Sequence, residues 1–123
     1  MSISDVYIDV LIEMAKRQAD LLKGTLDLLV LKTLALESRH GVGIADRIEQ
    51  ITRGTFLLKP GSLFPALHRL EADRLIAGEW RETPEGRRAR YYRLTARGER
   101  RLAEEKKNWA RIALAIGQVL ETD

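Results

Sequence analysis

Arginine is the residue type whose spacing in this chain most clearly suggests a chemistry. Between residues 79 and 101 there are eight arginines and four glutamates, so this stretch carries a net charge of +4, whereas the whole chain of 123 residues carries +3. The planar guanidinium group binds phosphate oxygens and base edges through paired hydrogen bonds. The segment therefore predicts contacts with nucleic acid, and the alternative is a solvated basic surface.

Residues that support catalysis or metal binding are scarce. The chain has no cysteine and two histidines, His40 and His68. It lacks the H-E-x-x-H pattern, the phosphate-binding P-loop, and the G-x-S-x-G and G-x-G-x-x-G patterns. We therefore expect no enzyme activity, no cofactor and no metal, and we expect no specific role for His40.

The composition is that of a single globular domain. Of the 123 residues, 45% are hydrophobic and 32% are charged. No apolar run approaches the roughly 18 residues that a membrane span needs, and residues 1–5 do not resemble a secretion signal. The absence of cysteine fits a reducing compartment. We expect a cytoplasmic protein with no membrane partner.

Hydrophobic periodicity predicts three helices in the first half of the chain, over residues 4–22, 26–37 and 42–52. Ser4 or Asp5 can cap the first of these helices. Gly24 is expected to end the first helix, and Thr25 to cap the second. The second helix is apolar around most of its circumference, so it should be central and buried.

The second half of the chain predicts an extended strip, two helices and a hairpin. Residues 55–58 are expected to form the strip, and Pro60 suits the first turn of a helix that runs to about residue 73. Residues 76–82 and 89–95 flank a Pro/Gly turn and predict a β-hairpin. Thr95 is expected to cap a last helix over residues 96–120. In the 60–73 helix the inward stripe is Leu63, Leu67 and Leu70.

Two short helices followed by an arginine-bearing hairpin are typical of a winged helix-turn-helix. The expected fold is therefore mainly α with a small β-hairpin, with added N-terminal and C-terminal dimerisation helices. We divide the chain into an N-terminal helix (1–22), a DNA-binding domain (23–95) and a C-terminal dimerisation helix (96–123). The helix over residues 60–73 takes the recognition position, and the hairpin is the wing.

Four motifs in this order carry a family resemblance: Gly24-Thr25-Leu26, Gly41-Val42-Gly43-Ile44, the run from Gly61 to Glu71, and the run from Gly86 to Thr95. Together they resemble the PadR family of transcriptional regulators. The resemblance implies a winged-helix DNA-binding domain, a C-terminal helix that forms a dimer, and in most members repression. The chain departs from the family pattern at Phe64 and Val42, where tyrosine is common, and at Arg74-Leu75, where a glycine is common.

The candidate DNA-binding residues lie on the recognition helix and on the wing. Each has an alternative: Ser62 as a cap only, Phe64 and His68 as packing residues, Arg69 paired with Glu71 or Asp73, and Arg90 as a brace of the wing. Arg87 and Arg88 follow Gly86 at the wing tip and are the strongest candidates. The full set is Lys59, Ser62, Phe64, His68, Arg69, Arg87, Arg88 and Arg90.

The last helix carries a coiled-coil-like seam. We expect this seam and residues 4–22 to pack across the two-fold axis of a homodimer; the alternative is packing within one chain. Trp109 is expected to anchor the interface, and the alternative, implied by the family resemblance, is a pocket for a small aromatic effector. The seam residues are Leu102, Trp109, Ile112, Ile116 and Val119.

These observations predict a dimeric, sequence-specific regulator that binds a double-stranded DNA operator and represses transcription. The recognition helix carries few polar side chains that could contact bases, which leaves open one alternative function other than DNA binding. In that alternative, the winged helix is a protein-interaction module whose basic face binds an acidic protein partner.

Overall fold

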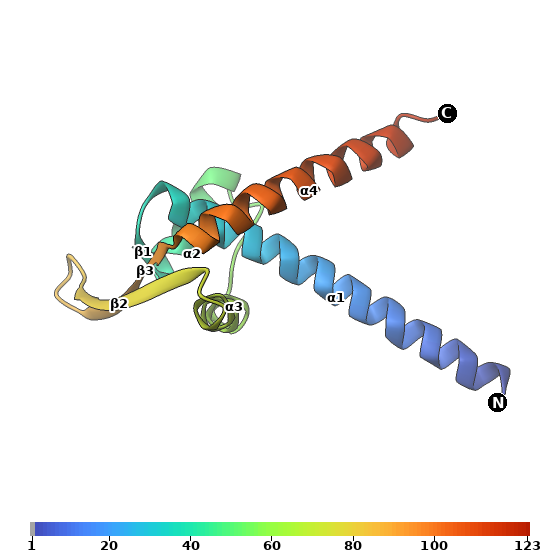
Figure 1. Ribbon diagram of the computed structural model, residues 1–123, viewed down its shortest axis with the longest axis horizontal. Helices are drawn as coiled ribbons and strands as arrows, with labels where there is room; N and C mark the ends of the chain where they lie inside the picture. The colour runs from blue at the N-terminus through green and yellow to red at the C-terminus, as the bar shows by residue number, and fades with distance from the viewer. Residues whose placement is uncertain (1) are drawn as a thin grey trace.

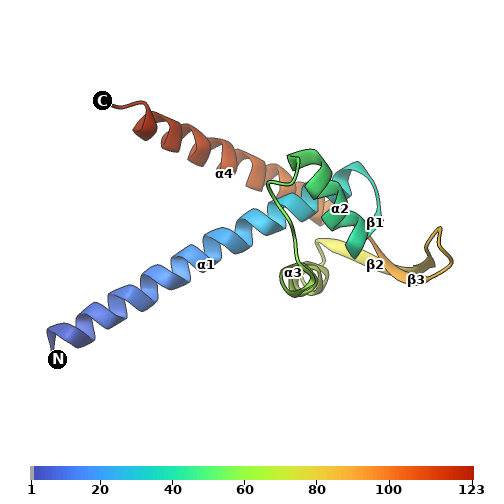
Figure 2. The same cartoon turned by 180° about the vertical axis from the view of Figure 1, so that it is seen from behind.

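The computed structural model describes the backbone of residues 2–123 and the side chains of residues 2–13 and 24–123. Two long helices form a V, with both termini at the open end and a β-hairpin projecting from the closed end (Figures 1 and 2). The remaining helices pack beside the point where the long helices cross. The elements are α1 (Ile3–Leu36), β1 (Arg39–His40), α2 (Gly41–Thr52), α3 (Pro60–Ala72), β2 (Ile76–Glu82), β3 (Arg88–Leu94) and α4 (Ala96–Leu120).

The first helix is continuous, so the expected break at Gly24 and Thr25 is wrong. A glycine inside a helix costs only about 1 kcal/mol relative to alanine, and good helix formers continue on both sides of it. The expected caps are also wrong. Ser2 caps α1, with its Oγ accepting the N–H of Asp5 at 3.2 Å while the Asp5 carboxylate accepts the N–H of Ser2 at 3.4 Å.

One hydrophobic core holds the crossing point together. It confirms the inward stripe of α3, but it buries only part of the segment 26–37, which was expected to be central and buried, since Leu36 is 54% exposed. Each helix contributes residues spaced three or four apart, which is the period that turns one face inward. The core residues are Val30, Leu31 and Leu34 of α1, Ile44 and Ile48 of α2, Leu63, Leu67 and Leu70 of α3, then Leu75, Ile76, Tyr92 and Leu102.

The hairpin forms as predicted and belongs to a sheet of three antiparallel strands in the order β1-β3-β2. The strand β1 was not predicted, because its two residues carry no periodicity; they pair only with Tyr91 and Tyr92. The expected strip over residues 55–58 does not form a strand. The outer part of the hairpin therefore consists of β2 and β3 alone.

The recognition helix begins and ends as its sequence predicts. Pro60 occupies its first turn, and the helix continues through Pro65 to Ala72. Arg74 then adopts a left-handed backbone with a φ of 61°. An L-residue pays a steric penalty in this region and glycine does not, which explains why the family pattern favours glycine at this point.

The last helix starts against the core and then leaves it. Thr95 caps it as predicted, accepting the N–H of Gly98 at 3.0 Å. A side chain at Gly98 would bring its Cβ within 2.0 Å of the Leu75 carbonyl oxygen, so only glycine lets α4 approach this closely. Beyond the crossing, α1 and α4 diverge (Figure 1).

Candidate nucleic-acid interface

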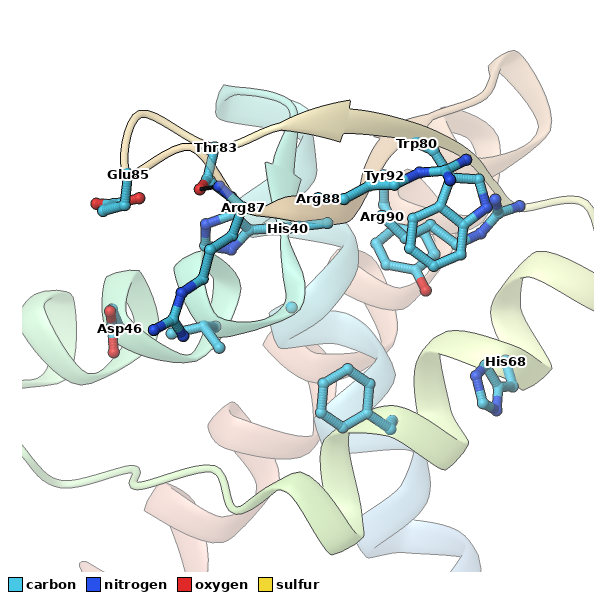
Figure 3. A pocket seen from close by; sticks show the side chains of 14 residues that line it. His40, Asp46, His68, Trp80, Thr83, Glu85, Arg87, Arg88, Arg90 and Tyr92 are labelled. Atoms are coloured by element: carbon cyan, nitrogen blue, oxygen red, sulfur yellow. Dashed lines mark hydrogen bonds between the residues drawn. The ribbon is translucent and has the colours of Figure 1, made fainter.

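A groove of about 810 Å³ separates the wing from the start of α2 and the exposed side of α3. Arg87, Arg88 and Arg90 of the wing line it, as does His68 of α3 (Figure 3). Phe64 of α3 lines it as well. Two carboxylates, those of Asp46 and Glu85, also line it. Its lining brings together five of the eight predicted DNA-binding residues, namely Phe64, His68, Arg87, Arg88 and Arg90.

The wing tip is a hydrogen-bonded turn that presents two exposed arginines. The Arg87 N–H donates to Thr83 Oγ1 at 3.1 Å, and the Gly86 N–H donates to the Thr83 carbonyl at 2.9 Å. Gly86 has a φ of 81°, a conformation that favours glycine. This turn sets Arg87 and Arg88 at the start of β3 with both side chains exposed. Their charges face the groove.

Arg90 is tied to the recognition helix. Its Nη2 lies 2.5 Å from Glu71 Oε2, and its Nε donates to Glu71 Oε1 at 3.4 Å. The hydrogen bond from Arg90 holds the pKa of Glu71 below its ordinary value, and the same bond raises the pKa of Arg90. The bracing role weighed as the alternative is thus the observed geometry.

Trp80 is the groove residue that sequence reasoning missed. The Arg88 guanidinium carbon lies 5.1 Å from the Trp80 ring centroid, and that of Arg90 lies 5.7 Å away. Both distances fall within the range of a cation–π contact. A signal was available, because the hairpin register pairs Trp80 directly with Arg90 and places both on the face toward α3.

The polar residues of α3 differ in their environment. Arg69 forms an ion pair with Asp27 of α1, a partner that its sequence neighbours did not suggest. Lys59 and Ser62 are exposed at the N-terminus of α3, where the Lys59 carbonyl accepts the Ser62 N–H at 3.0 Å. His68 is exposed. Lys59, Ser62 and Arg69 lie outside the groove lining, so the structure does not bring them together with the wing.

Phe64 packs against the start of α2. A Cβ on Gly41 would lie 2.9 Å from its ring, so the absence of a side chain at Gly41 makes room for the phenyl group. Phe64 nevertheless keeps 39% of its surface exposed toward the groove. It thus combines the packing role with a position on the candidate interface.

His40 has a structural role, contrary to expectation. Its Nδ1 accepts the Gly43 N–H at 2.8 Å and so caps α2. Its ring meets the Tyr91 ring edge-on, with the centroids 5.1 Å apart. His40 thereby fixes the end of α2 that borders the groove.

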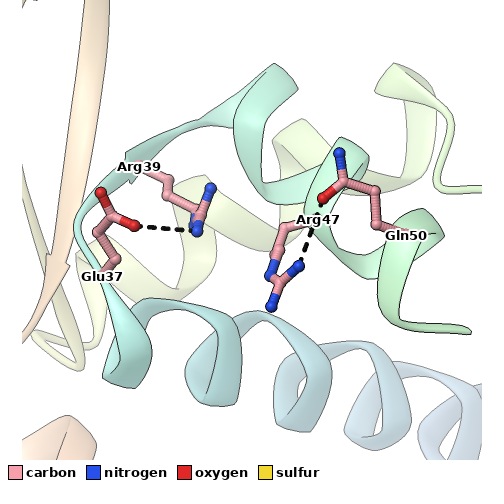
Figure 4. A network of polar contacts seen from close by, with 4 residues as sticks. All are labelled: Glu37, Arg39, Arg47 and Gln50. Carbon is pink, nitrogen blue, oxygen red and sulfur yellow. Dashed lines mark hydrogen bonds and ion pairs between the residues drawn. The ribbon is translucent and has the colours of Figure 1, made fainter.

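Two further arginines form contacts beside α1 rather than in the groove (Figure 4). Arg39 Nη2 lies 3.1 Å from Glu37 Oε2, and Arg47 Nη1 donates to Gln50 Oε1 at 3.4 Å. Neither arginine lines the groove. The arginines of the groove lining therefore all come from the wing.

The predicted dimer residues fall into two groups. Leu102 is buried in the core of its own chain, and Ile112 is half-buried. Trp109, Ile116 and Val119 are 46%, 51% and 73% exposed, on the arm of α4 that leaves the core. The unburied part of the seam therefore begins at Trp109.

Within the described residues, no helix has the length and apolar character needed to cross a bilayer.

Comparison with known proteins places this architecture among regulators. Residues 30–104 match the profile of the family described as "Transcriptional regulator PadR-like family". Transcriptional regulator Rv3488 of Mycobacterium tuberculosis is 35% identical over 77 residues, which span 63% of this chain and 68% of that protein.

Two crystal structures show the same fold. A PadR family transcriptional regulator from Eggerthella lenta is 30% identical, with a TM-score of 0.69 over 96% of this chain and 98% of its own. A PadR family transcription regulator from Clostridium difficile is 31% identical, with a TM-score of 0.67 over 77% of this chain and 97% of its own. These relatives are regulators rather than enzymes.

Proposed function

Because the chain belongs to the PadR-like family of transcriptional regulators, we propose that it binds a DNA operator as a dimer and represses transcription. The observation that carries this proposal is the groove lined by three wing arginines together with residues of α2 and of the exposed side of α3. An α-helix fits the major groove of DNA, and cationic side chains beside it contact phosphates or the minor groove. In this arrangement α3 enters the major groove, and the wing arginines contact the DNA backbone beside it.

The division of polar groups indicates how such a complex gains affinity and selectivity. The exposed start of α3 offers Lys59 and Ser62 to phosphates, and His68 is the long polar side chain that it directs outward. Base readout by α3 is therefore modest. Arg87 and Arg88 supply charge at the wing, so electrostatics and DNA shape contribute much of the binding.

Exposed apolar side chains on the two arms support the dimer. Ile8 and Leu11 of α1 are 52% and 47% exposed, and Ile116 and Val119 of α4 are exposed as well. A contiguous patch of exposed apolar side chains marks an interaction surface. We assign Trp109 to this interface rather than to a pocket for a small aromatic effector, because it lies on the same helical face as Ile112 and Ile116.

The DNA-binding proposal is tested by fluorescence anisotropy of the purified protein with its own promoter duplex and a scrambled duplex over a salt series. A preference for the promoter that persists as salt rises supports an operator-specific regulator. Equal and steeply salt-dependent binding to both duplexes supports the basic wing but places the operator elsewhere. No binding to either duplex overturns the proposal and favours the acidic protein partner, which a pull-down would then identify.

Repression and dimerisation have separate tests. Addition of the protein to in vitro transcription from the bound promoter should lower transcript yield, and an increase would identify an activator. For the dimer, sedimentation should show that Ile116→Asp shifts the protein to the monomer. Leu114→Asp is the matched control, because Leu114 is 65% exposed but lies on the opposite face of α4; a monomeric wild type would overturn the dimer.

A further inference from the structure

A row of stacked side chains connects the recognition helix to the outer wing. We propose that Trp80 is a positioning residue for DNA binding, whose indole holds the Arg88 guanidinium at a fixed place relative to α3. The row runs from Glu71 on α3 through Arg90 and Trp80 to Arg88 (Figure 3 shows its last three members). This inference rests on the proposed DNA-binding function and adds a residue to it.

The inner end of the row is fixed by charge and by space. Glu71 accepts both Arg90 contacts described above. A Cβ on Gly78 would lie 2.7 Å from Arg90 Nε, so the glycine leaves room for Arg90 to lie across β2 in this position. Arg90 is therefore held by the Glu71 carboxylate and by its contact with the Trp80 ring.

The outer end of the row depends on the aromatic ring. Trp80 pairs with Arg90 across the hairpin, while Arg88 pairs with Glu82 one step further out on the same face. Both guanidinium groups therefore lie within cation–π distance of the same indole ring, at 5.7 Å for Arg90 and 5.1 Å for Arg88. Trp80 keeps 56% of its surface exposed. A side chain this exposed contributes little to the stability of the core. Its ring instead restricts the movement of the Arg88 side chain.

The wing needs such a brace because its outer part has no third strand. β1 pairs only with Tyr91 and Tyr92, so the hairpin beyond them is a two-stranded ribbon. Isolated two-stranded hairpins are marginally stable in water, and an arginine side chain loses considerable rotamer freedom when it binds. Stacking on Trp80 reduces both costs before DNA arrives. The Arg88 guanidinium then approaches the DNA backbone at a fixed distance from α3.

A double-mutant cycle tests this role, with the dissociation constant for the promoter duplex as the readout. We expect Trp80→Leu to weaken binding about 10-fold and Trp80→Phe, which keeps a stacking ring, to weaken it no more than about 3-fold. In an Arg88→Ala background, Trp80→Leu should have almost no further effect. A merely structural role of Trp80 would give the same loss in both backgrounds.

Arg81 provides the matched control. Its guanidinium carbon lies 5.1 Å from the Tyr91 ring centroid, on the other face of the same hairpin and outside the groove lining. Trp80→Leu should therefore add to Arg81→Ala without coupling. If the wild type binds the promoter but Trp80 and Arg88 show no coupling, the positioning role is overturned and DNA binding stands. If the wild type binds no duplex, both proposals are overturned.

Discussion

The two elements that flank the groove use their arginines differently. On α3 the guanidinium of Arg69 is engaged by Asp27 of α1. On the wing, Arg87 and Arg88 are exposed at the rim of the groove, and Arg90 is anchored to α3. The difference teaches that position in the fold decides whether a cation is available for a ligand. In the proposed complex, the helix contributes mainly its shape to DNA binding, and the wing contributes charge.

Removing the wing charge should have the largest effect. Arg87→Ala combined with Arg88→Ala is expected to weaken binding to the promoter duplex about 100-fold, since charge-assisted contacts are among the strongest polar interactions. If each arginine contacts one phosphate, the slope of log affinity against log salt should fall in magnitude by about 2. Anisotropy titrations over a salt series measure both quantities.

The control removes two cations elsewhere. Lys107→Ala with Arg111→Ala changes the net charge equally but lies on α4, outside the groove lining. The wing and control variants should differ sharply in affinity and salt slope. Equal losses would mean that net charge rather than the wing carries the binding, and the contrast between wing and helix would be broken.

A second variant tests how closely the backbone of α3 approaches DNA. A Cβ at Gly61 meets no atom within 4 Å, so Gly61→Ala should leave stability unchanged or raise the free energy of unfolding by up to about 1 kcal/mol. Because residue 61 lies at the start of the recognition helix, we expect affinity for the promoter to fall about 10-fold through contact of the methyl group with DNA. Denaturant unfolding and anisotropy separate the two effects.

Gly117 supplies the comparison for that variant. It is also helical, and an added Cβ there also meets nothing within 4 Å, but it lies near the end of α4. Gly117→Ala should match the stability change and leave DNA affinity unaltered. Unchanged affinity in Gly61→Ala would mean that the start of α3 stays away from the base edges.

The sequence predicted the elements that depend on local signals. The Pro60 start of α3, the Pro/Gly turn of the hairpin and the Thr95 cap of α4 are each set by residues close together in the chain. Gly24 was misread as a helix end because a local helix-breaking signal was outweighed by the helix formers around it and by Leu26, which packs partly buried against the core. Local reasoning identifies where elements can start and stop, but not which signals the packed fold overrides.

The sequence predicted which arginines belong to the site. It did not predict which of them are engaged in ion pairs within the fold. Arg69 pairs with Asp27, which is 42 residues away in the sequence, and Arg90 pairs with Glu71, which is 19 residues away. Such pairs depend on how helices and strands dock, which periodicity does not encode. Trp80 differs, because alternation and the hairpin register already place it opposite Arg90.

A variant of Arg69 sharpens the contrast from the helix side. Since the Asp27 carboxylate engages its guanidinium, Arg69→Ala should weaken binding no more than about 3-fold and leave the salt slope unchanged within about half a unit. The same salt-series titration measures this. A slope change near 1 would show that Arg69 leaves Asp27 and contacts a phosphate in the complex.

The smallest effect concerns the ion pair that joins α3 to the wing. The hydrogen bond from Arg90 is the largest cause of the lowered pKa of Glu71, so Glu71 stabilises the fold while it is ionised. A lowered folded-state pKa gives a contribution that is full above the ordinary value of 4.5 and is lost as the pH falls below it.

We therefore expect Glu71→Gln to lower the melting temperature by at most about 3 °C at pH 7, because partly exposed ion pairs stabilise little. The difference from wild type should vanish at acidic pH, as measured by thermal unfolding between pH 3 and pH 7. Glu79→Gln is the control, since Glu79 pairs with Arg81 on the same wing but in solvent, with side chains 60% and 46% exposed. A difference for Glu71→Gln that persisted at acidic pH would show that shape rather than charge joins the wing to α3.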